Sequence, residues 1–202
     1  RGFPLGTAMN YHVSVVTPPA ALPVTLAEAK AHLRVLHTTE DTLIDRLIKA
    51  AVAHVESKCG AALITRTLRV LRDTFPANGG AMVLPVAPVT TVSEITYVDT
   101  AGAAQTLAGS AYVLAGGTVR SEVSPVAETW PATQRGRRQI AVTFTAGYGA
   151  ASTDMPEDMR AALLLLIEHY YHHRSAVIEG TMSPTPLGVE ALLGPYMTTG
   201  WI

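Results

Sequence analysis

A cluster of histidines near residue 170 is the strongest candidate for chemistry in the sequence. In the run Glu168-His169-Tyr170-Tyr171-His172-His173, His169 stands three residues before His172 and four before His173, so all three can share one helix face. Such histidines can bind zinc, with Glu168 as a further ligand. The spacing is not the His-Glu-x-x-His pattern of metalloproteases, and no second cluster supplies clear further ligands. Because histidines also suit helix C-termini, we expect no metal.

Other patterns that could carry chemistry are incomplete. Gly147-Tyr148-Gly149 lacks the further glycine or the Lys-Ser/Thr pair of a phosphate-binding loop, so it is expected to form a tight strand-to-helix turn. No serine lies in a Gly-x-Ser-x-Gly elbow. Cys59 has no basic neighbour at a diagnostic spacing and is expected to be a small buried apolar residue. We therefore predict no catalytic residue and no cofactor.

A basic segment, Arg135 to Arg138, is the clearest concentration of positive charge. Arg135, Arg137 and Arg138 surround a single glycine. The segment is either a solvated hairpin tip or an electrostatic contact with DNA or an acidic partner. We favour the hairpin tip.

Composition narrows the classes of function. Of the 202 residues, 48% are hydrophobic and only 15% are charged, against roughly 25% charged in typical soluble domains. This low-charge surface suits a protein that is largely covered by partners. The formal net charge is −1, whereas dedicated nucleic-acid binders carry a basic excess, so only non-specific contact with passing DNA stays open. No apolar run approaches the roughly 18 residues of a membrane span, and no secretory signal is recognisable.

Helix signals stand at both ends of the chain. Thr25 with Glu28 forms a capping box, and Thr38 or Thr39 is expected to cap a second helix that ends at Gly60. A third helix follows Pro156, with Asp154 as its expected cap, and runs to about Arg174.

The middle of the chain is rich in Thr, Val, Gly and Pro and predicts an antiparallel sheet or partial barrel. The expected strands are 67–72, 89–98, 110–114, 118–123 and 139–145. The fold class is therefore α+β, a helical core of N-terminal hairpin and long C-terminal helix with an inserted antiparallel β-rich subdomain. We divide the chain into an extended arm (1–23, with 1–8 expected to derive from cloning), a helical hairpin (24–62), a β-rich insertion (63–150), a core helix (151–175) and a docking tail (176–202).

The third helix is apolar on every side between Ala161 and Ile167, which predicts burial on every side. A neighbouring subunit is expected to cover part of it. The predicted subunit-interface residues are Leu163, Leu164, Ile167, Tyr170 and Tyr171. The tail is too apolar for a disordered segment, so it either docks on a partner, which we favour, or folds back on its own domain. The predicted docking residues are Pro186, Leu187, Val189, Leu192, Leu193, Tyr196, Met197 and Trp201.

A series of short motifs in a fixed order carries a family resemblance. These motifs are 23–35, Glu40-Asp41-Thr42-Leu43-Ile44, Leu84-Pro85, Pro88-Val89, 95–99, Trp130-Pro131, 144–149, Pro156, 163–166 and His169-Tyr170-Tyr171. Across about residues 13–197 the sequence resembles the head–tail connector (adaptor) family of long-tailed phages, prophages and gene transfer agents.

The resemblance implies a structural subunit of the virion head–tail junction, assembled in the host cytoplasm, with no catalytic residues. It implies a dodecameric ring beneath the portal protein that extends the DNA channel and meets the next neck or tail protein, a stopper or tail terminator. The resemblance also implies that the C-terminal segment contacts the portal. A closed ring needs two different faces on each subunit, which the third helix and the extended arm can supply. The alternatives are a metal-dependent hydrolase using His169, His172 and His173, or another neck component such as a stopper or tail-completion protein.

Overall fold

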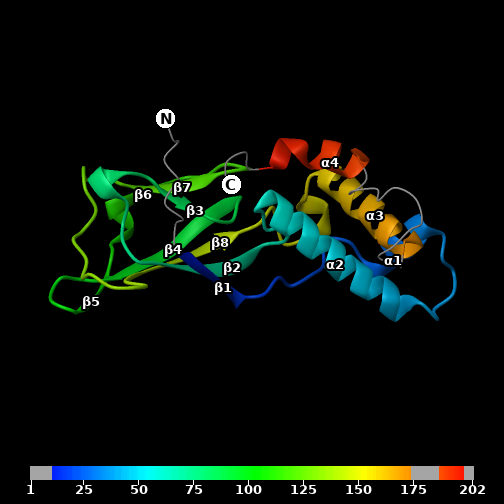
Figure 1. The fold of residues 1–202 in the computed structure, drawn as a ribbon, viewed down its shortest axis with the longest axis horizontal. Coiled ribbons are helices and arrows are strands. Elements are labelled where there is room, and N and C mark those ends of the chain that lie inside the picture. The colour runs from blue at the N-terminus through cyan, green and yellow to red at the C-terminus, as the bar shows by residue number, and fades with distance from the viewer. Residues whose placement is uncertain (1–10, 174–186, 198–202) are drawn as a thin grey trace, which may run out of the picture.

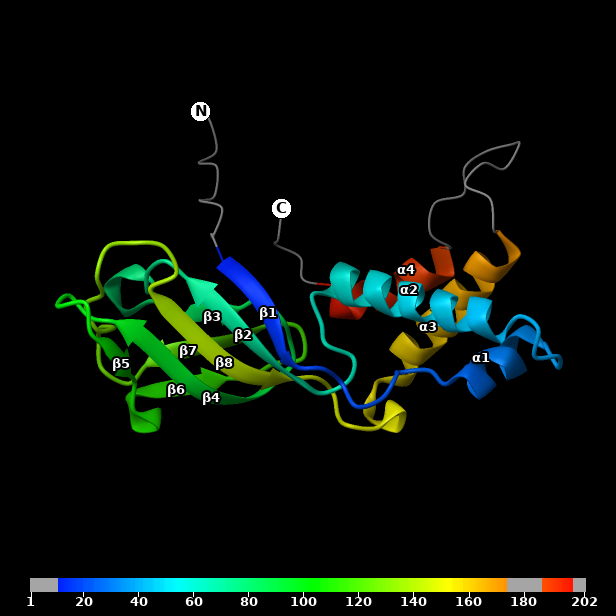
Figure 2. The same cartoon turned by 90° about the horizontal axis from the view of Figure 1, so that it is seen from below.

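The computed structural model describes residues 11–173 and 187–197 and shows two lobes along the long axis of the molecule (Figures 1 and 2). One lobe is helical, and the other consists of two antiparallel sheets. Each lobe has its own apolar core. The predicted α+β fold, a helical part with an inserted antiparallel β-rich part, is confirmed.

The helical lobe packs its helices around α3. Its helices are α1 (Leu26–Leu33), α2 (Asp41–Cys59), α3 (Glu157–His172) and α4 (Leu187–Leu193). In α2 the buried side chains recur every three or four residues, so one stripe faces the core: Ile44, Ile48, Ala51, Val55 and Cys59. No helix among the described residues is both long and apolar enough to cross a bilayer.

Two of the predicted helix boundaries hold and two differ. Thr25 caps α1 by accepting the Glu28 backbone N–H at 3.2 Å, and Gly60 ends α2 in the left-handed conformation with φ 61°. Glu40, not a threonine, precedes α2, because the Thr39 hydroxyl bonds His37 instead. Asp154 accepts the Ala151 N–H at 2.9 Å and so closes the turn before α3 rather than capping α3 itself.

The β lobe is a pair of facing sheets. Its strands are β1 (Tyr11–Thr17), β2 (Arg66–Arg72), β3 (Met82–Leu84), β4 (Val89–Val98), β5 (Ala104–Thr106), β6 (Tyr112–Ala115), β7 (Ser121–Pro125) and β8 (Ile140–Ala146). The larger sheet has the order β1-β2-β8-β4-β5 and the smaller one β3-β7-β6. Buried and partly exposed residues alternate along β8, so one face of this strand lies in the core. Its buried residues are Ile140, Val142, Phe144 and Ala146.

The segment expected to be an extended N-terminal arm contributes a strand to the β lobe. β1 pairs antiparallel with β2, with Val13 opposite Val70 and Tyr11 opposite Arg72. Arg72 explains why the β2 pattern alternates imperfectly in the sequence. It points inward, and its guanidinium donates to the carbonyl oxygen of Val83 on β3. The buried Arg72 thus links the larger sheet to the smaller one through a hydrogen bond from β2 to β3.

Candidate assembly surfaces

The chain passes between the two lobes three times, at about residues 18–25, 60–65 and 147–156. In the second crossing, Ala62 belongs to the β core and the adjacent Leu63 to the helical core. The Glu56 carboxylate on α2 accepts the Leu63 backbone N–H at 3.1 Å and also pairs with Arg66 on β2. The relative placement of the surfaces on both lobes is therefore fixed by buried contacts.

Gly147 at the end of β8 permits the close approach of two crossings. Its φ is +136°, and a Cβ at this position would lie 2.5 Å from the backbone of Thr65. The Gly147 N–H donates to the Pro88 carbonyl oxygen, and the Thr65 N–H donates to that of Gly149. Glycine is thus required at position 147. The predicted tight strand-to-helix turn is wrong, because a longer connection that contains the short helix Ser152–Asp154 separates β8 from α3.

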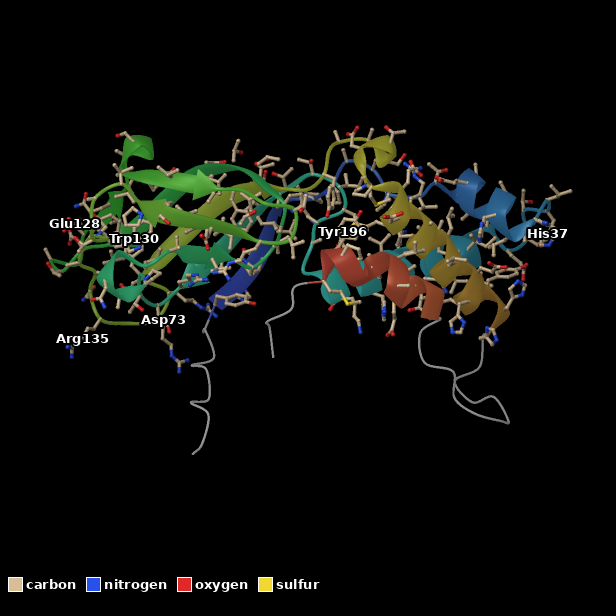
Figure 3. The ribbon with its side chains drawn as sticks, turned by 90° about the horizontal axis from the view of Figure 1, so that it is seen from above. His37, Asp73, Glu128, Trp130, Arg135 and Tyr196 are labelled. Carbon is tan, nitrogen blue, oxygen red and sulfur yellow. The ribbon has the colours of Figure 1, made fainter. Side chains whose placement is uncertain are left out.

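Tyr148 lies in this junction beside Tyr196 and Cys59. Burial of the phenol, followed by the proximity of Tyr196 and Cys59, raises the pKa of Tyr148 to about 12. Its hydroxyl has no hydrogen-bond partner among the residues that the structure describes. Figure 3 shows Tyr196 near the middle of the molecule, at the end of the helical lobe that faces the β lobe.

The described part of the C-terminal segment folds against its own protomer. Val189 and Leu193 of α4 are fully buried in the helical core. Leu192, Tyr196 and Met197 pack on that core but stay half-buried. Pro186, Trp201 and the side chain of Leu187 lie outside the described residues. The expectation that Val189 and Leu193 dock on a partner is corrected, because α3 already covers them.

The apolar helix α3 is also covered mostly from within the chain. Leu163 and Ile167 are fully buried by α1, α2 and α4, so the expectation that a neighbouring subunit must cover them is corrected. Leu164, Tyr170 and Tyr171 are only partly buried. The Tyr171 hydroxyl donates to Glu40 at the start of α2. The interface role of Leu164, Tyr170 and Tyr171 stays a prediction.

The histidines at the end of α3 contact different aromatic neighbours. The rings of His169 and His173 stack with centroids 4.6 Å apart, whereas His172 lies against Tyr171. Burial, and to a smaller degree His173, lowers the pKa of His169. Glu168 faces away to His32 on α1, at 3.2 Å. No group of three or more metal-ligating side chains is found among the described residues.

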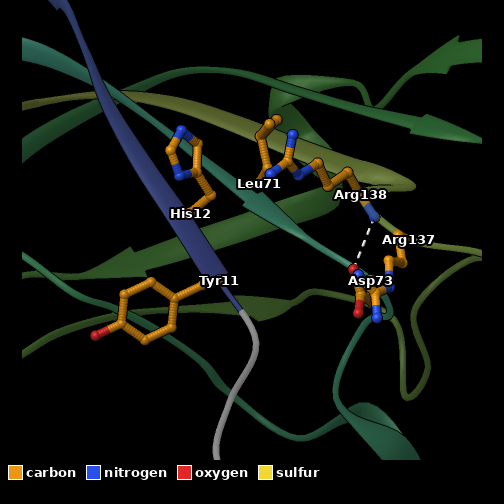
Figure 4. Close-up of a pocket in the computed structure, with 6 residues that line it drawn as sticks. All are labelled: Tyr11, His12, Leu71, Asp73, Arg137 and Arg138. Atoms are coloured by element: carbon orange, nitrogen blue, oxygen red, sulfur yellow. Dashed lines mark hydrogen bonds between the residues drawn. The ribbon is translucent and has the colours of Figure 1, made fainter.

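The basic loop lies at the far end of the β lobe, where Figure 3 labels Arg135 and Asp73. Arg137 and Arg138 are exposed. The predicted hairpin tip is wrong, because the segment leads from β7 of the smaller sheet to β8 of the larger sheet, and the loop is anchored. The backbone N–H of Arg138, in the left-handed region at φ 57°, donates to Asp73 at 2.7 Å. The loop and the first residues of β1 enclose a polar hollow of about 280 Å³ (Figure 4). It is lined by Tyr11, His12, Leu71, Asp73, Arg137 and Arg138.

No pattern in the sequence indicates the charged groups that join the helices. Arg160 on α3 donates to Glu28 on α1 at 3.0 Å and to the backbone carbonyl oxygen of Ser152. Glu28, expected to complete the capping box, is therefore engaged with another helix. Only the tertiary fold brings these residues together, since 132 positions separate Arg160 from Glu28.

Solved structures similar to this chain are virus-like particles and their necks. One is described as "Virion of native gene transfer agent (GTA) particle", with 30% identity, a TM-score of 0.78 and coverage of 94% of this chain and 97% of that chain. A second, "Neck of empty GTA particle computed with C6 symmetry", has 29% identity, a TM-score of 0.77 and coverage of 95% and 97%. A third, "Neck of native GTA particle computed with C12 symmetry", has 30% identity, a TM-score of 0.75 and the same coverage.

The family comparison agrees with these structures. No curated protein sequence matches the chain. Residues 24–183 match the family described as "HCP: Head completion protein", a range that includes both helical parts and the whole insertion between them. The resemblance drawn from the order of the short motifs is thereby confirmed, and the chain belongs to the head completion protein family.

Proposed function

We propose that this protein is a structural subunit of the neck that joins the head of a phage, prophage or gene transfer agent particle to its tail. The observation that carries the proposal is the likeness to GTA virion and neck chains over 94% or more of the sequence. A likeness of this extent includes both lobes and the junction between them. A structural role of this kind requires no catalytic group. Among the described residues, no group of three or more metal-ligating side chains supports the alternative of a metal-dependent hydrolase.

We further propose that copies of the chain form a dodecameric ring around the path of the DNA. The C12 symmetry of one similar neck supports this number. A closed ring needs two unlike faces on each copy. Leu164, Tyr170 and Tyr171 on α3 are suited to one face because they are apolar or aromatic and only partly covered.

The portal protein and the next neck or tail protein are the proposed partners at the two ends of the ring. For portal docking we retain Leu192, Tyr196 and Met197, which remain accessible on the α4 side of the helical lobe. Pro186, Leu187 and Trp201 belong to the same proposal by their position in the chain. Val189 and Leu193 support it indirectly, by fixing α4 on the core.

A complementation experiment in a particle-producing host tests the neck role. Loss of the protein should leave filled or empty heads without tails, and the wild-type gene should restore joined particles visible by electron microscopy. The double variant Tyr196→Ala/Met197→Ala should fold but restore few joined particles. Val113→Ala/Val126→Ala, at exposed positions of the β lobe, is the matched control and should restore them fully. Joined particles in the absence of the protein would refute the neck role.

A further inference from the structure

The outer edge of β1 is open. β1 is the last strand of the larger sheet, and no other strand of the described residues pairs with it on the side away from β2. Val15 lies opposite Leu68 and therefore on the core side of the sheet, yet 54% of its surface is exposed. Val16 at the adjacent irregularity is equally exposed. The edge thus presents backbone donors and acceptors together with uncovered apolar side chains.

The hollow at the beginning of the same strand is basic. Arg137 and Arg138 line it together with His12 of β1 (Figure 4). No hydrogen bond or ion pair involves either guanidinium group within the part of the chain that is described. The only acidic residue of the lining, Asp73, already accepts the backbone N–H of Arg138. The hollow therefore carries two guanidinium charges against one carboxylate, which leaves a positive excess for an anion.

We propose that this edge receives an extended acidic segment of another protein by strand addition. The segment pairs with the backbone of Val13–Thr17, covers Val15, and places a carboxylate against Arg137 and Arg138. Strand addition gives affinity through main-chain hydrogen bonds, and side-chain pockets give selectivity. Each of these arginines can hold a carboxylate through charge-assisted hydrogen bonds, so the hollow selects segments with glutamate or aspartate at one end.

The observations favour a polypeptide over a nucleic acid at this edge. Phosphate contacts would use the arginines but neither the outer edge of β1 at Val13–Thr17 nor the exposed Val15 and Val16. The net charge of −1 also supplies little long-range attraction for DNA. The proposal goes beyond the neck role, because it concerns the isolated protein and requires neither a ring nor a portal.

Synthetic peptides test the proposal on the full-length protein. The probes are two capped, fluorescently labelled peptides of alternating threonine and valine, with a glutamate pair at the N-terminal end of one and at the C-terminal end of the other. One of them should bind, as measured by fluorescence anisotropy. On its addition, hydrogen exchange followed by NMR should slow at alternate amides of Val13–Thr17, because every second N–H of an edge strand points outward.

Two variants with equal charge loss separate the site from general attraction. Arg137→Ala/Arg138→Ala should weaken binding by roughly tenfold. Arg46→Ala/Arg120→Ala removes two exposed arginines elsewhere and should leave the affinity within about twofold. Lysine in place of the glutamates should abolish binding. Peptide binding without protection of β1 amides would overturn the proposal, and so would tighter, Arg137/Arg138-dependent binding of a short DNA duplex. Absence of binding by both acidic peptides would also overturn it.

Discussion

At the scale of single residues, Tyr148 is distinguished by a strongly raised pKa. Its hydroxyl is enclosed in the junction without a hydrogen-bond partner among the described residues, and its pKa is raised to about 12. An unpaired buried hydroxyl costs stability, so Tyr148→Phe should raise the free energy of unfolding at neutral pH by up to about 1 kcal/mol. Urea unfolding of both proteins measures this difference.

The same substitution has a pH signature whose sign follows from the raised pKa. The unfolded chain loses the Tyr148 proton near its ordinary pKa of 10.0, whereas the folded protein keeps it until about 12. Between these values the unfolded state binds fewer protons, so wild-type stability falls as the pH rises. The advantage of the phenylalanine variant should therefore grow above pH 10. An advantage that stays constant between about pH 8 and pH 11 would contradict the assignment.

At the scale of elements, α4 is a short helix held by two buried side chains. Because Val189 and Leu193 fill the core beside α3, Leu193→Ala should lower the free energy of unfolding by about 2–4 kcal/mol. Glu190→Ala on the same helix is the control. Its ion pair with Lys58 is exposed and 4.0 Å long, so the change should be below about 1 kcal/mol. Equal effects of the two substitutions in thermal unfolding would show that α4 is not part of the core.

The elements that the sequence predicted well are those with a strong local pattern. β4 was predicted at its observed bounds because seven of the ten residues from Val89 to Val98 are β-branched. α1 and the end of α2 carry capping residues that act locally. β3 and β5 are too short to show a period, and each exists through its partner strand. The segment of β1 was predicted only as an extended arm. Its partner strand β2 is distant in the sequence, with 55 positions between the hydrogen-bonded residues Ser14 and Arg69, so no local pattern indicates the pairing.

The candidate surfaces were less predictable than the fold. The pattern of an apolar helix such as α3 predicts that the helix is buried, but it does not indicate which element covers it. Here α4 covers part of it, so Leu163 and Ile167 are core residues, whereas their neighbour Leu164 is only partly buried. The basic loop was visible in the sequence, but the hollow that it forms depends on β1 lying beside it. The local sequence pattern thus predicts where helices and strands form. Which face of each element is buried depends on the tertiary packing.

At the scale of the whole molecule, the two lobes should unfold together because buried groups join them. The Glu56 carboxylate links α2 to the crossing and to β2 through Leu63 and Arg66. In a Trp201→Phe background, tryptophan fluorescence reports on Trp130 in the β lobe, and far-ultraviolet circular dichroism is dominated by the helices; the two should give coincident denaturant transitions. A ring subunit benefits from this coupling, since its surfaces keep one relative orientation.

Glu56→Ala should separate these transitions. It leaves the Leu63 N–H and the Arg66 guanidinium without their acceptor in a half-buried place, at a cost of about 2–3 kcal/mol. Asp45→Ala removes a carboxylate from an exposed pair with Lys49 on the same helix and should change stability by less than about 0.5 kcal/mol. Glu56→Ala/Arg66→Ala should recover part of the loss, because the unpaired cation is then gone. Coincident transitions in Glu56→Ala, with no more loss than in Asp45→Ala, would mean that the lobes are held together by apolar contacts alone.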